Sequence, residues 1–271
     1  PKIAKIYDSM HVSYSAIDLD EHGVCIYSLE DHQIDIMHLS PSHHFPTGII
    51  TPISRRYELL GWASKDENRY IIEDDYDSEF RFSGQPIPAL QGLVADAPVV
   101  YIGTFSKTLF PALRTAWLVV PTAPAARFHQ TVERQPCTVP NLWQQTLADF
   151  IQQGHFWRHL KKMRASYSQR RQWLESALQA QGFQVTPQLG GIQLVMSVSG
   201  DDRLLARRAV VAGLAVQALS DWRIRHAGEG GLLMSFTNIR SAAMADALAR
   251  RIIADRGAQG LTRICYLHCL P

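Results

Sequence analysis

The hydrophobic positions in the first 120 residues or so form short runs, separated by polar and glycine-containing segments. Short runs rich in valine, isoleucine and tyrosine predict β-strands, and runs that are apolar on both faces are typical of a sheet covered by helices. A helix at residues 54–63, after the breaker cluster at 45–48, predicts a crossover between the first two strands. The pattern predicts an α/β domain with strands at residues 34–39, 70–72, 99–102 and 116–120.

The spacing of apolar residues becomes helical after residue 144. Steps of three, four and seven residues place these side chains on one stripe and predict a single long helix over 144–181. The stripe consists of Phe156, Leu160, Met163, Tyr167, Leu174 and Leu178. Further strands are predicted at 183–185, 191–198 and 232–236, before a closing helix at 242–254. We expect a large domain with its linking helix over residues 1–164, a small C-terminal α/β domain over 165–257, and an irregular tail over 258–271.

Composition excludes several classes of protein. The chain is 46% hydrophobic and 19% charged, which favours a folded globular protein. Its net charge of +2 is dispersed, so this segment lacks the concentrated basic surface that nucleic-acid binding requires. The apolar runs are far shorter than the ~20 residues of a membrane helix, and no signal-peptide pattern is present. With four scattered cysteines, a cytoplasmic protein is the simplest prediction.

Three potential metal ligands lie in the C-terminal tail: Cys265, His268 and Cys269. Structural zinc sites normally use a second pair of ligands, which this cluster lacks. The sequence therefore predicts no metal site.

One lysine follows the third predicted strand in Gly103-Thr104-Phe105-Ser106-Lys107-Thr108. Ligands of α/β sheets gather at such strand ends. A lysine that forms a Schiff base must lose its proton near neutral pH, and a nearby cation such as Arg114 lowers its pKa in that direction. A solvated lysine that caps the next helix is the alternative. A nucleotide phosphate loop is excluded, because Ser106 and Tyr101 stand where that motif requires glycine.

A second group of polar residues ends the strand at 70–72 and runs from Glu73 to Asp77. In an extended chain Asp74 and Tyr76 share one face, and Asp75 points the opposite way. A carboxylate that faces a pyridine nitrogen keeps that nitrogen protonated, and a phenol can hydrogen-bond a neighbouring ring oxygen. A solvated turn or a helix cap is the alternative for such acids.

The pattern Asp74-x-Tyr76, Thr104-x-x-Lys107 and Arg114 resembles fold-type-I pyridoxal-phosphate enzymes such as aspartate aminotransferases. Four longer segments, at residues 41–48, 72–81, 88–92 and 101–111, are similar to the MocR/GabR subfamily of GntR-type bacterial transcription regulators. The resemblance covers about residues 1–255. It implies a three-layer, mostly parallel sheet, which is the fold-type-I large domain in incomplete form, with a smaller C-terminal α/β domain.

The same resemblance implies roles for individual residues. Lys107 would bind pyridoxal 5'-phosphate as a Schiff base, Asp74 would pair with the pyridine nitrogen, and Tyr76 would bond the 3'-oxygen. Thr104 and Arg114 would hold the phosphate, as a hydroxyl and a guanidinium suit that group. Ser106 is a further phosphate candidate.

The sequence departs from catalytic relatives at two positions. Phe45 stands where aminotransferases usually place an asparagine. A neighbouring His43 or His44 is a candidate substitute, and a packed or solvated histidine is the simpler interpretation. Leu233 stands where catalytic relatives commonly carry an arginine that binds the substrate carboxylate. Arg223 and Arg225 are the candidates to replace it.

The resemblance implies the effector domain of a transcription regulator, which responds to a small amino compound. The alternatives are an active aminotransferase, for which the same compound is a substrate, and a non-functional remnant, so catalysis stays open. The chain begins at Pro1 with text typical of a domain interior, and we interpret it as a fragment. DNA would be bound only through an N-terminal domain outside this chain. A homodimer is implied by resemblance alone.

Overall fold

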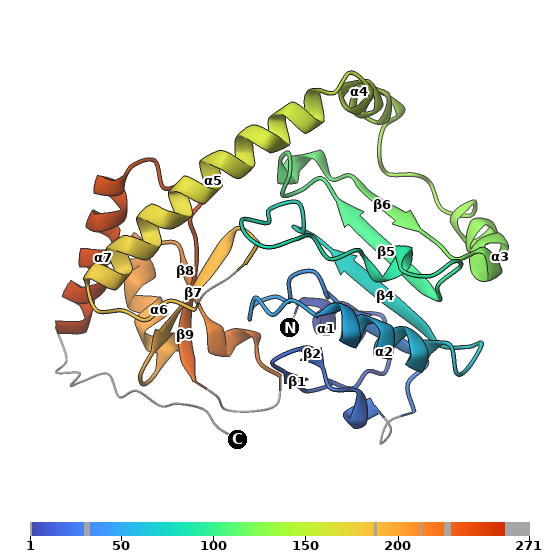
Figure 1. The fold of residues 1–271 in the computed structure, drawn as a ribbon, viewed down its shortest axis with the longest axis horizontal. Helices are drawn as coiled ribbons and strands as arrows, with labels where there is room; N and C mark the ends of the chain where they lie inside the picture. Colours follow the sequence, from blue (N-terminus) through green and yellow to red (C-terminus); the bar gives the residue numbers. More distant parts are fainter. Residues whose placement is uncertain (1, 30–32, 187–188, 212, 225–228, 258–271) are drawn as a thin grey trace. The chain divides into compact units, whose positions relative to one another are not determined.

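The computed structural model describes residues 2–29, 33–186, 189–211, 213–224 and 229–257. The chain forms two compact units, which Figure 1 shows as ribbons. The larger unit contains residues 15–165 and 188–191, and the smaller contains the described parts of 1–14, 166–187 and 192–271. The long helix α5 (His155–Ala180) contributes residues to both units.

A four-stranded sheet is the centre of the larger unit, in the order β3-β4-β5-β6. The first two pairs of neighbours are parallel, and β6 runs antiparallel to β5, so the sheet is mostly parallel as predicted. Each observed strand overlaps a predicted one. Their bounds are β3 Ile36–Leu39, β4 Tyr70–Asp75, β5 Val99–Thr104 and β6 Ala116–Val119.

One face of this sheet packs against helix α2 (Ile53–Ala63), the predicted crossover between β3 and β4. Ile71 and Val99 from the sheet lie in one buried cluster with Leu59 and Leu60 of the helix. Along β4, alternate residues are buried, starting at Ile71, because side chains of a strand alternate between its faces. The remaining residues of β4 face the other side.

The predicted helix over 144–181 is wrong in one respect, because the structure has two helices there. Helix α4 (Asn141–Gln152) ends before Gly154, and α5 begins at His155. Gly154 has a φ of 73°, a left-handed conformation that glycine adopts without strain and that interrupts a helix. The other elements of the larger unit are β1 Leu19–Asp20, β2 Gly23–Val24, α3 Thr122–Val132 and the 3₁₀ turns Ile26–Leu29, Leu90–Gly92 and Pro111–Leu113.

The smaller unit contains an antiparallel three-stranded sheet in the order β7-β9-β8. The strand predicted at 183–185 is wrong: in that segment, which lies within the described residues, only Val185 forms an isolated bridge, to Met196. Leu174, Leu178 and Phe236 are among the fully buried side chains of the smaller unit. The elements are α1 Lys2–Ser9, β7 Gln193–Val198, α6 Asp202–Val211, β8 Val216–Ala218, a 3₁₀ turn Leu219–Trp222, β9 Gly230–Ser235 and α7 Ala242–Gly257.

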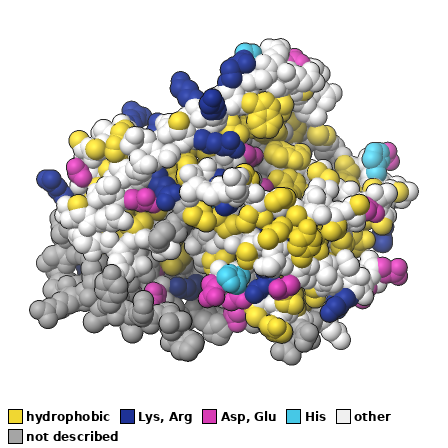
Figure 2. Space-filling model, in the orientation of Figure 1, with side chains coloured by type: hydrophobic (Ala, Val, Ile, Leu, Met, Phe, Trp, Pro, Cys, Tyr) yellow, Lys and Arg dark blue, Asp and Glu magenta, His cyan; other side chains and the backbone are white. Residues whose placement is uncertain are grey.

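Hydrophobic side chains gather on the surface over the four-stranded sheet, as the yellow area in Figure 2 shows. Leu118 and Val119 of β6, and Phe110 before it, are exposed hydrophobic residues. Strand β6 lies at the edge of the sheet, so its outer backbone groups have no strand partner among the described residues. Within the described residues, no helix is long and apolar enough to cross a membrane.

Candidate cofactor site

Lys107 lies on a turn that follows β5, and its side chain is exposed. The backbone N–H of Leu109 closes this turn by donating to the Phe105 carbonyl at 2.9 Å. Thr108 is buried, and its carbonyl oxygen lies 2.9 Å from Nε2 of His159. The backbone on both sides of Lys107 is therefore anchored, at the carboxyl end of a parallel strand.

Two hydroxyl groups lie beside this turn. Oγ1 of Thr104 is 2.9 Å from Oγ of Ser106 and accepts from the Ser106 N–H at 3.2 Å. The carbonyl of Thr115 accepts from the Phe105 N–H at 3.2 Å, which brings the preceding residue, Arg114, next to the same turn. Arg114 is exposed and has a φ of 52°. Hydroxyls and a guanidinium are the kinds of donor that fit a phosphate group.

Asp74 lies on the face of the sheet that α2 does not cover. It is in register with Ile102, and Thr104 is two residues further along β5, so all three share this face. The imidazole of His38 on β3 also lies there, with Nε2 3.7 Å from Asp74 Oδ2. A carboxylate, a hydroxyl and the turn of Lys107 thus meet at the ends of neighbouring strands. This arrangement fits a phosphorylated pyridine aldehyde.

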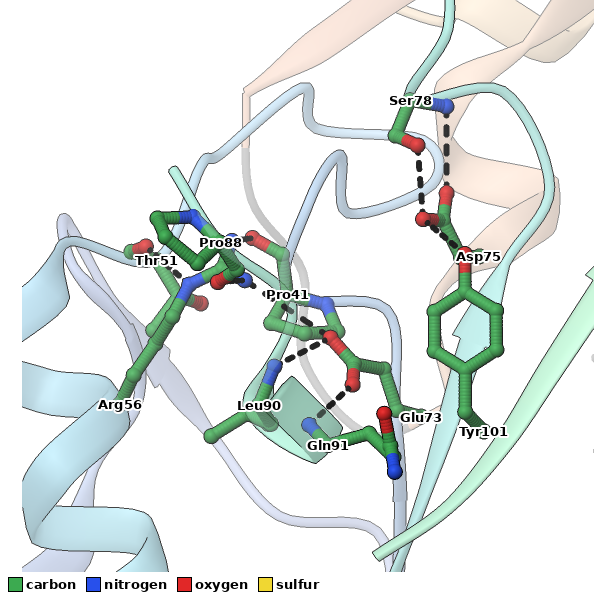
Figure 3. A network of polar contacts seen from close by, with 10 residues as sticks. All are labelled: Pro41, Thr51, Arg56, Glu73, Asp75, Ser78, Pro88, Leu90, Gln91 and Tyr101. Atoms are coloured by element: carbon green, nitrogen blue, oxygen red, sulfur yellow. Dashed lines mark hydrogen bonds and ion pairs between the residues drawn. The ribbon is translucent and has the colours of Figure 1, made fainter. Parts of the chain in front are cut away.

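Asp75 occupies the opposite face, as the alternation along the strand predicts. Its carboxylate accepts from the Ser78 hydroxyl at 2.7 Å, from the Ser78 N–H at 3.1 Å and from the Tyr101 hydroxyl at 2.8 Å (Figure 3). Burial, reinforced by Asp75, raises the pKa of the Tyr101 phenol far above its usual range. Asp75 is therefore a structural acceptor.

Tyr76 is held by His43, from the loop after β3. The Tyr76 hydroxyl donates to the His43 carbonyl at 2.9 Å, and Nδ1 of the same histidine lies 3.1 Å from the phenol oxygen. Burial raises the pKa of Tyr76 strongly, and nearby carboxylates add to this effect, so the phenol stays protonated. The ring of Phe45 packs edge-on against Tyr76, at 6.4 Å between centroids. Phe45 thus serves as a packing residue.

Asp77 was not among the predicted site residues. It is 2% exposed, its Oδ2 lies 3.2 Å from Nδ1 of His43, and its Oδ1 has no hydrogen-bond partner among the described residues. Burial raises the pKa of Asp77, while His43 and Lys107 counteract that shift. The acid-rich run from Glu73 to Asp77 was the only sequence signal, and it did not distinguish buried from solvated carboxylates.

Of the two arginine candidates, the structure describes Arg223, which belongs to the smaller unit. The guanidinium of Arg223 donates to the Glu229 carbonyl, and Arg225 lies outside the described residues. Leu233 is 2% exposed within β9, so its position is part of the hydrophobic core. Cys265, His268 and Cys269 also lie outside the described residues.

A cavity of about 240 Å³ in the larger unit lies on the α2 side of β4. Its lining includes His43, Asp75, Arg81 and Tyr101. None of the predicted cofactor residues lines it. The candidate cofactor site is thus an open face of the sheet, separate from this cavity.

Glu79 provides a pH-dependent contribution to stability that can be measured. Burial raises its pKa to about 7. The protonated form is therefore favoured in the folded state, so this stabilisation is complete below the unfolded pKa of about 4.5 and is lost as pH rises through 7. In the wild-type chain the free energy of unfolding is expected to fall by an amount on the order of 2 kcal/mol between pH 5 and pH 8 because of Glu79. Glu79→Gln is expected to abolish this fall.

Urea unfolding of wild type and Glu79→Gln at both pH values measures this difference. Glu67→Gln changes an exposed carboxylate and is the matched control. A pH dependence that is identical in wild type and Glu79→Gln would exclude Glu79 as its source.

Comparison with known proteins identifies the family. Residues 18–253 match the model of the family described as aminotransferase class I and II. The uncharacterized HTH-type transcriptional regulator YdeL of Bacillus subtilis is 38% identical over 179 residues, which cover 66% of this chain and 38% of the relative. The probable rhizopine catabolism regulatory protein MocR of Rhizobium meliloti is 33% identical over 230 residues, which cover 82% of this chain and 46% of the relative.

The fold is also similar to that of solved aminotransferases. The multiple substrate aminotransferase of Thermococcus profundus superposes with a TM-score of 0.77 over 92% of this chain and 66% of that chain, at 24% identity. This similarity confirms the predicted fold type. The chain spans less than half the length of the two regulators. It belongs to the aminotransferase class I and II family, whose implied cofactor is pyridoxal 5'-phosphate, and its sequence is similar to MocR-type transcription regulators.

Proposed function

We propose that this chain is the pyridoxal-phosphate-binding effector domain of a bacterial transcription regulator. The observation that carries the proposal is the common face of Asp74 and Thr104 at the ends of two parallel strands, next to the turn of Lys107. The regulators named above support the regulatory part of the proposal. DNA binding would reside in a segment outside this chain, and the effector would be a small amino compound.

Each part of the cofactor would have a partner among these residues. Lys107 would supply the amine that binds the aldehyde, and Asp74 would pair with the ring nitrogen. Tyr76 would donate to the 3'-oxygen, and Thr104, Ser106 and Arg114 would hold the phosphate. When bound, the cofactor supplies an electrophilic carbon that exchanges one amine for another. Lys107 would be the amine that a small amino compound replaces, and that replacement would be the signal that the domain senses.

Sensing is favoured over turnover because Leu233, which is buried in β9, stands in place of an arginine that binds the substrate carboxylate. Arg223 and Arg225 remain candidates for an effector carboxylate. A regulator of this type changes DNA affinity only if the effector binds two conformations with different affinity. The proposal includes that the protein forms a homodimer and works in the cytoplasm.

Borohydride labelling tests the cofactor assignment. The chain is incubated with pyridoxal phosphate, reduced with borohydride, digested and analysed by mass spectrometry. The expected result is a single phosphopyridoxyl label on Lys107, which Lys107→Ala abolishes and Lys65→Ala, at an exposed lysine, retains. Labelling at another lysine, or equal labelling of the Lys107→Ala chain, contradicts the proposal.

Product analysis separates sensing from catalysis. The loaded chain is mixed with an amino donor and a 2-oxo acid. A change in the cofactor's visible spectrum without accumulation of new 2-oxo acid is expected for a sensor. Sustained formation of product over many cofactor equivalents would establish an aminotransferase instead, while leaving the role of Lys107 intact.

A further inference from the structure

A buried polar cluster is formed by His43, Asp77 and Tyr76. Its geometry determines which of their atoms carry protons. Tyr76 has one hydroxyl proton and donates it to the His43 carbonyl. At 3.1 Å from Nδ1 of His43, the phenol oxygen can then only accept, so Nδ1 must carry a proton. Oδ2 of Asp77, 3.2 Å from the same nitrogen, is a second acceptor for that N–H.

Two members of the cluster are largely shielded from solvent. His43 is 5% exposed and Asp77 is 2% exposed. The imidazole of His43 packs directly against Gly191. A Cβ at residue 191 would lie 2.1 Å from Cε1 of His43, and the φ of 79° at this residue also favours glycine. Only a residue without a side chain leaves room for the ring in this orientation.

Oδ1 of Asp77 has no hydrogen-bond partner in the part of the chain that the structure describes, which makes the cluster unfavourable for folding. A buried acceptor without a partner destabilises a fold, because it loses its hydration without compensation. Asp75 and Lys107 are the other charged groups that act on the Asp77 carboxyl, and burial is the dominant influence on it. Stability alone therefore does not account for a carboxylate at this position beside the histidine.

We propose that His43 and Asp77 are positioning residues that hold the Tyr76 hydroxyl oxygen in place for the 3'-oxygen of the cofactor. In this structure the Tyr76 proton points to the His43 carbonyl. When the proton turns toward the cofactor, the bond accepted from Nδ1–H still holds the phenol oxygen. That bond also polarises the phenol and strengthens it as a donor. This inference rests on the proposed cofactor site.

The pH at which the visible absorption band of the bound cofactor changes measures this effect. That midpoint reports loss of the proton from the nitrogen that links Lys107 to the cofactor, which leaves negative charge on the 3'-oxygen. A donor to this oxygen stabilises the deprotonated form and lowers the midpoint. Tyr76→Phe is therefore expected to raise it by about 1–2 pH units, the size of one hydrogen bond to a charged group.

His43→Leu and Asp77→Asn are expected to raise the midpoint by about half a unit to one unit, because they act through Tyr76. The decisive chain is the double variant His43→Leu/Tyr76→Phe, whose midpoint should equal that of Tyr76→Phe alone. Additive shifts, or no shift in either single variant that still carries the Lys107 label, would overturn the inference. Loss of the label in wild type would refute the cofactor site itself.

Two further variants separate positioning from folding. Gly191→Ala keeps every polar group and displaces the imidazole, so it should shift the midpoint in the same direction. His44→Gln alters the adjacent, partly buried histidine, whose Nδ1 lies 2.8 Å from the Thr47 hydroxyl, and should leave the midpoint unchanged. Thermal unfolding of each chain without cofactor identifies any variant that fails to fold.

A measurement without cofactor tests the proton assignment. In a chain labelled with ¹⁵N-histidine, the His43 resonances should show a protonated Nδ1 at neutral pH. In Asp77→Asn the Tyr76 contact should persist with a changed Nδ1 shift. An unprotonated Nδ1 in the wild-type chain would contradict the arrangement on which the inference depends.

Discussion

Replacing Arg56 by leucine is expected to lower the free energy of unfolding by about 3–5 kcal/mol, which is typical when one partner of a buried charge pair is removed. Arg56 is 0% exposed, and its guanidinium donates to the carbonyls of Thr51 at 3.0 Å, Pro88 at 2.8 Å and Pro41 at 3.0 Å (Figure 3). Leucine removes all three hydrogen bonds, and the Pro41 carbonyl retains a bond from the Thr51 N–H at 2.9 Å. The free energy is measured by urea unfolding, monitored by circular dichroism and tryptophan fluorescence.

The partner charge makes this loss larger. Oε1 of Glu73 lies 3.7 Å from Nη1 of Arg56, and its two oxygens accept from the backbone N–H groups of Leu90 and Gln91 at 3.0 and 3.1 Å. Burial already raises the pKa of Glu73 in the presence of the arginine. Without the guanidinium, the carboxylate must take up a proton or remain charged without compensation, and both outcomes destabilise the folded state.

Arg55→Leu is the matched control, because the two arginines are neighbours on the same helix. Arg55 binds Asp20 and Glu58, whose carboxylates reach solvent, so its removal is expected to cost about 1 kcal/mol or less. Equal losses in the free energy of unfolding for Arg55→Leu and Arg56→Leu would show that burial does not make Arg56 more important for stability than Arg55.

The strands of the larger unit were predictable because their hydrophobic runs are short and continuous. The prediction at 70–72 was too short, because the acids after Ile72 are typical of a turn, whereas β4 continues to Asp75. Glu73 and Asp75 are buried there by partners distant in sequence: Arg56, Leu90 and Tyr101. Periodicity within one segment carries no information on such partners.

The helical stripe after residue 144 predicted the helical region but not its interruption. Apolar residues keep their spacing on both sides of Gly154, and a single glycine inside a helical pattern is often tolerated. The conformation of Gly154 depends on the surrounding fold. Similarly, the sequence offered His43 as a substitute for an asparagine or as a packed histidine, but not its partners, because the contacts with Tyr76 and Asp77 join residues more than thirty positions apart.

Asp74→Asn is expected to weaken binding of pyridoxal phosphate about 10- to 100-fold, the effect of losing one hydrogen bond to a charged group. The substitution keeps the size of the side chain and removes the charge that stabilises a protonated ring nitrogen. Because Asp74 lies on the open face and its described ionic contact is with His38 at 3.7 Å, the free energy of unfolding should change by less than ~1 kcal/mol. Cofactor affinity is measured by absorbance titration.

Asp75→Asn is expected to lower the free energy of unfolding and to leave cofactor affinity nearly unchanged, which is the reverse of Asp74→Asn. The reason is that neighbouring residues of a strand point to opposite faces of the sheet. Its carboxylate accepts three hydrogen bonds on the buried side, so the free energy of unfolding should decrease by about 1–3 kcal/mol. Cofactor affinity of the folded chain should change less than about threefold, well under the loss from one charged hydrogen bond. Together, the two variants test the orientation of β4 directly. If Asp75→Asn weakens cofactor binding and Asp74→Asn destabilises the fold, the cofactor lies on the side of α2.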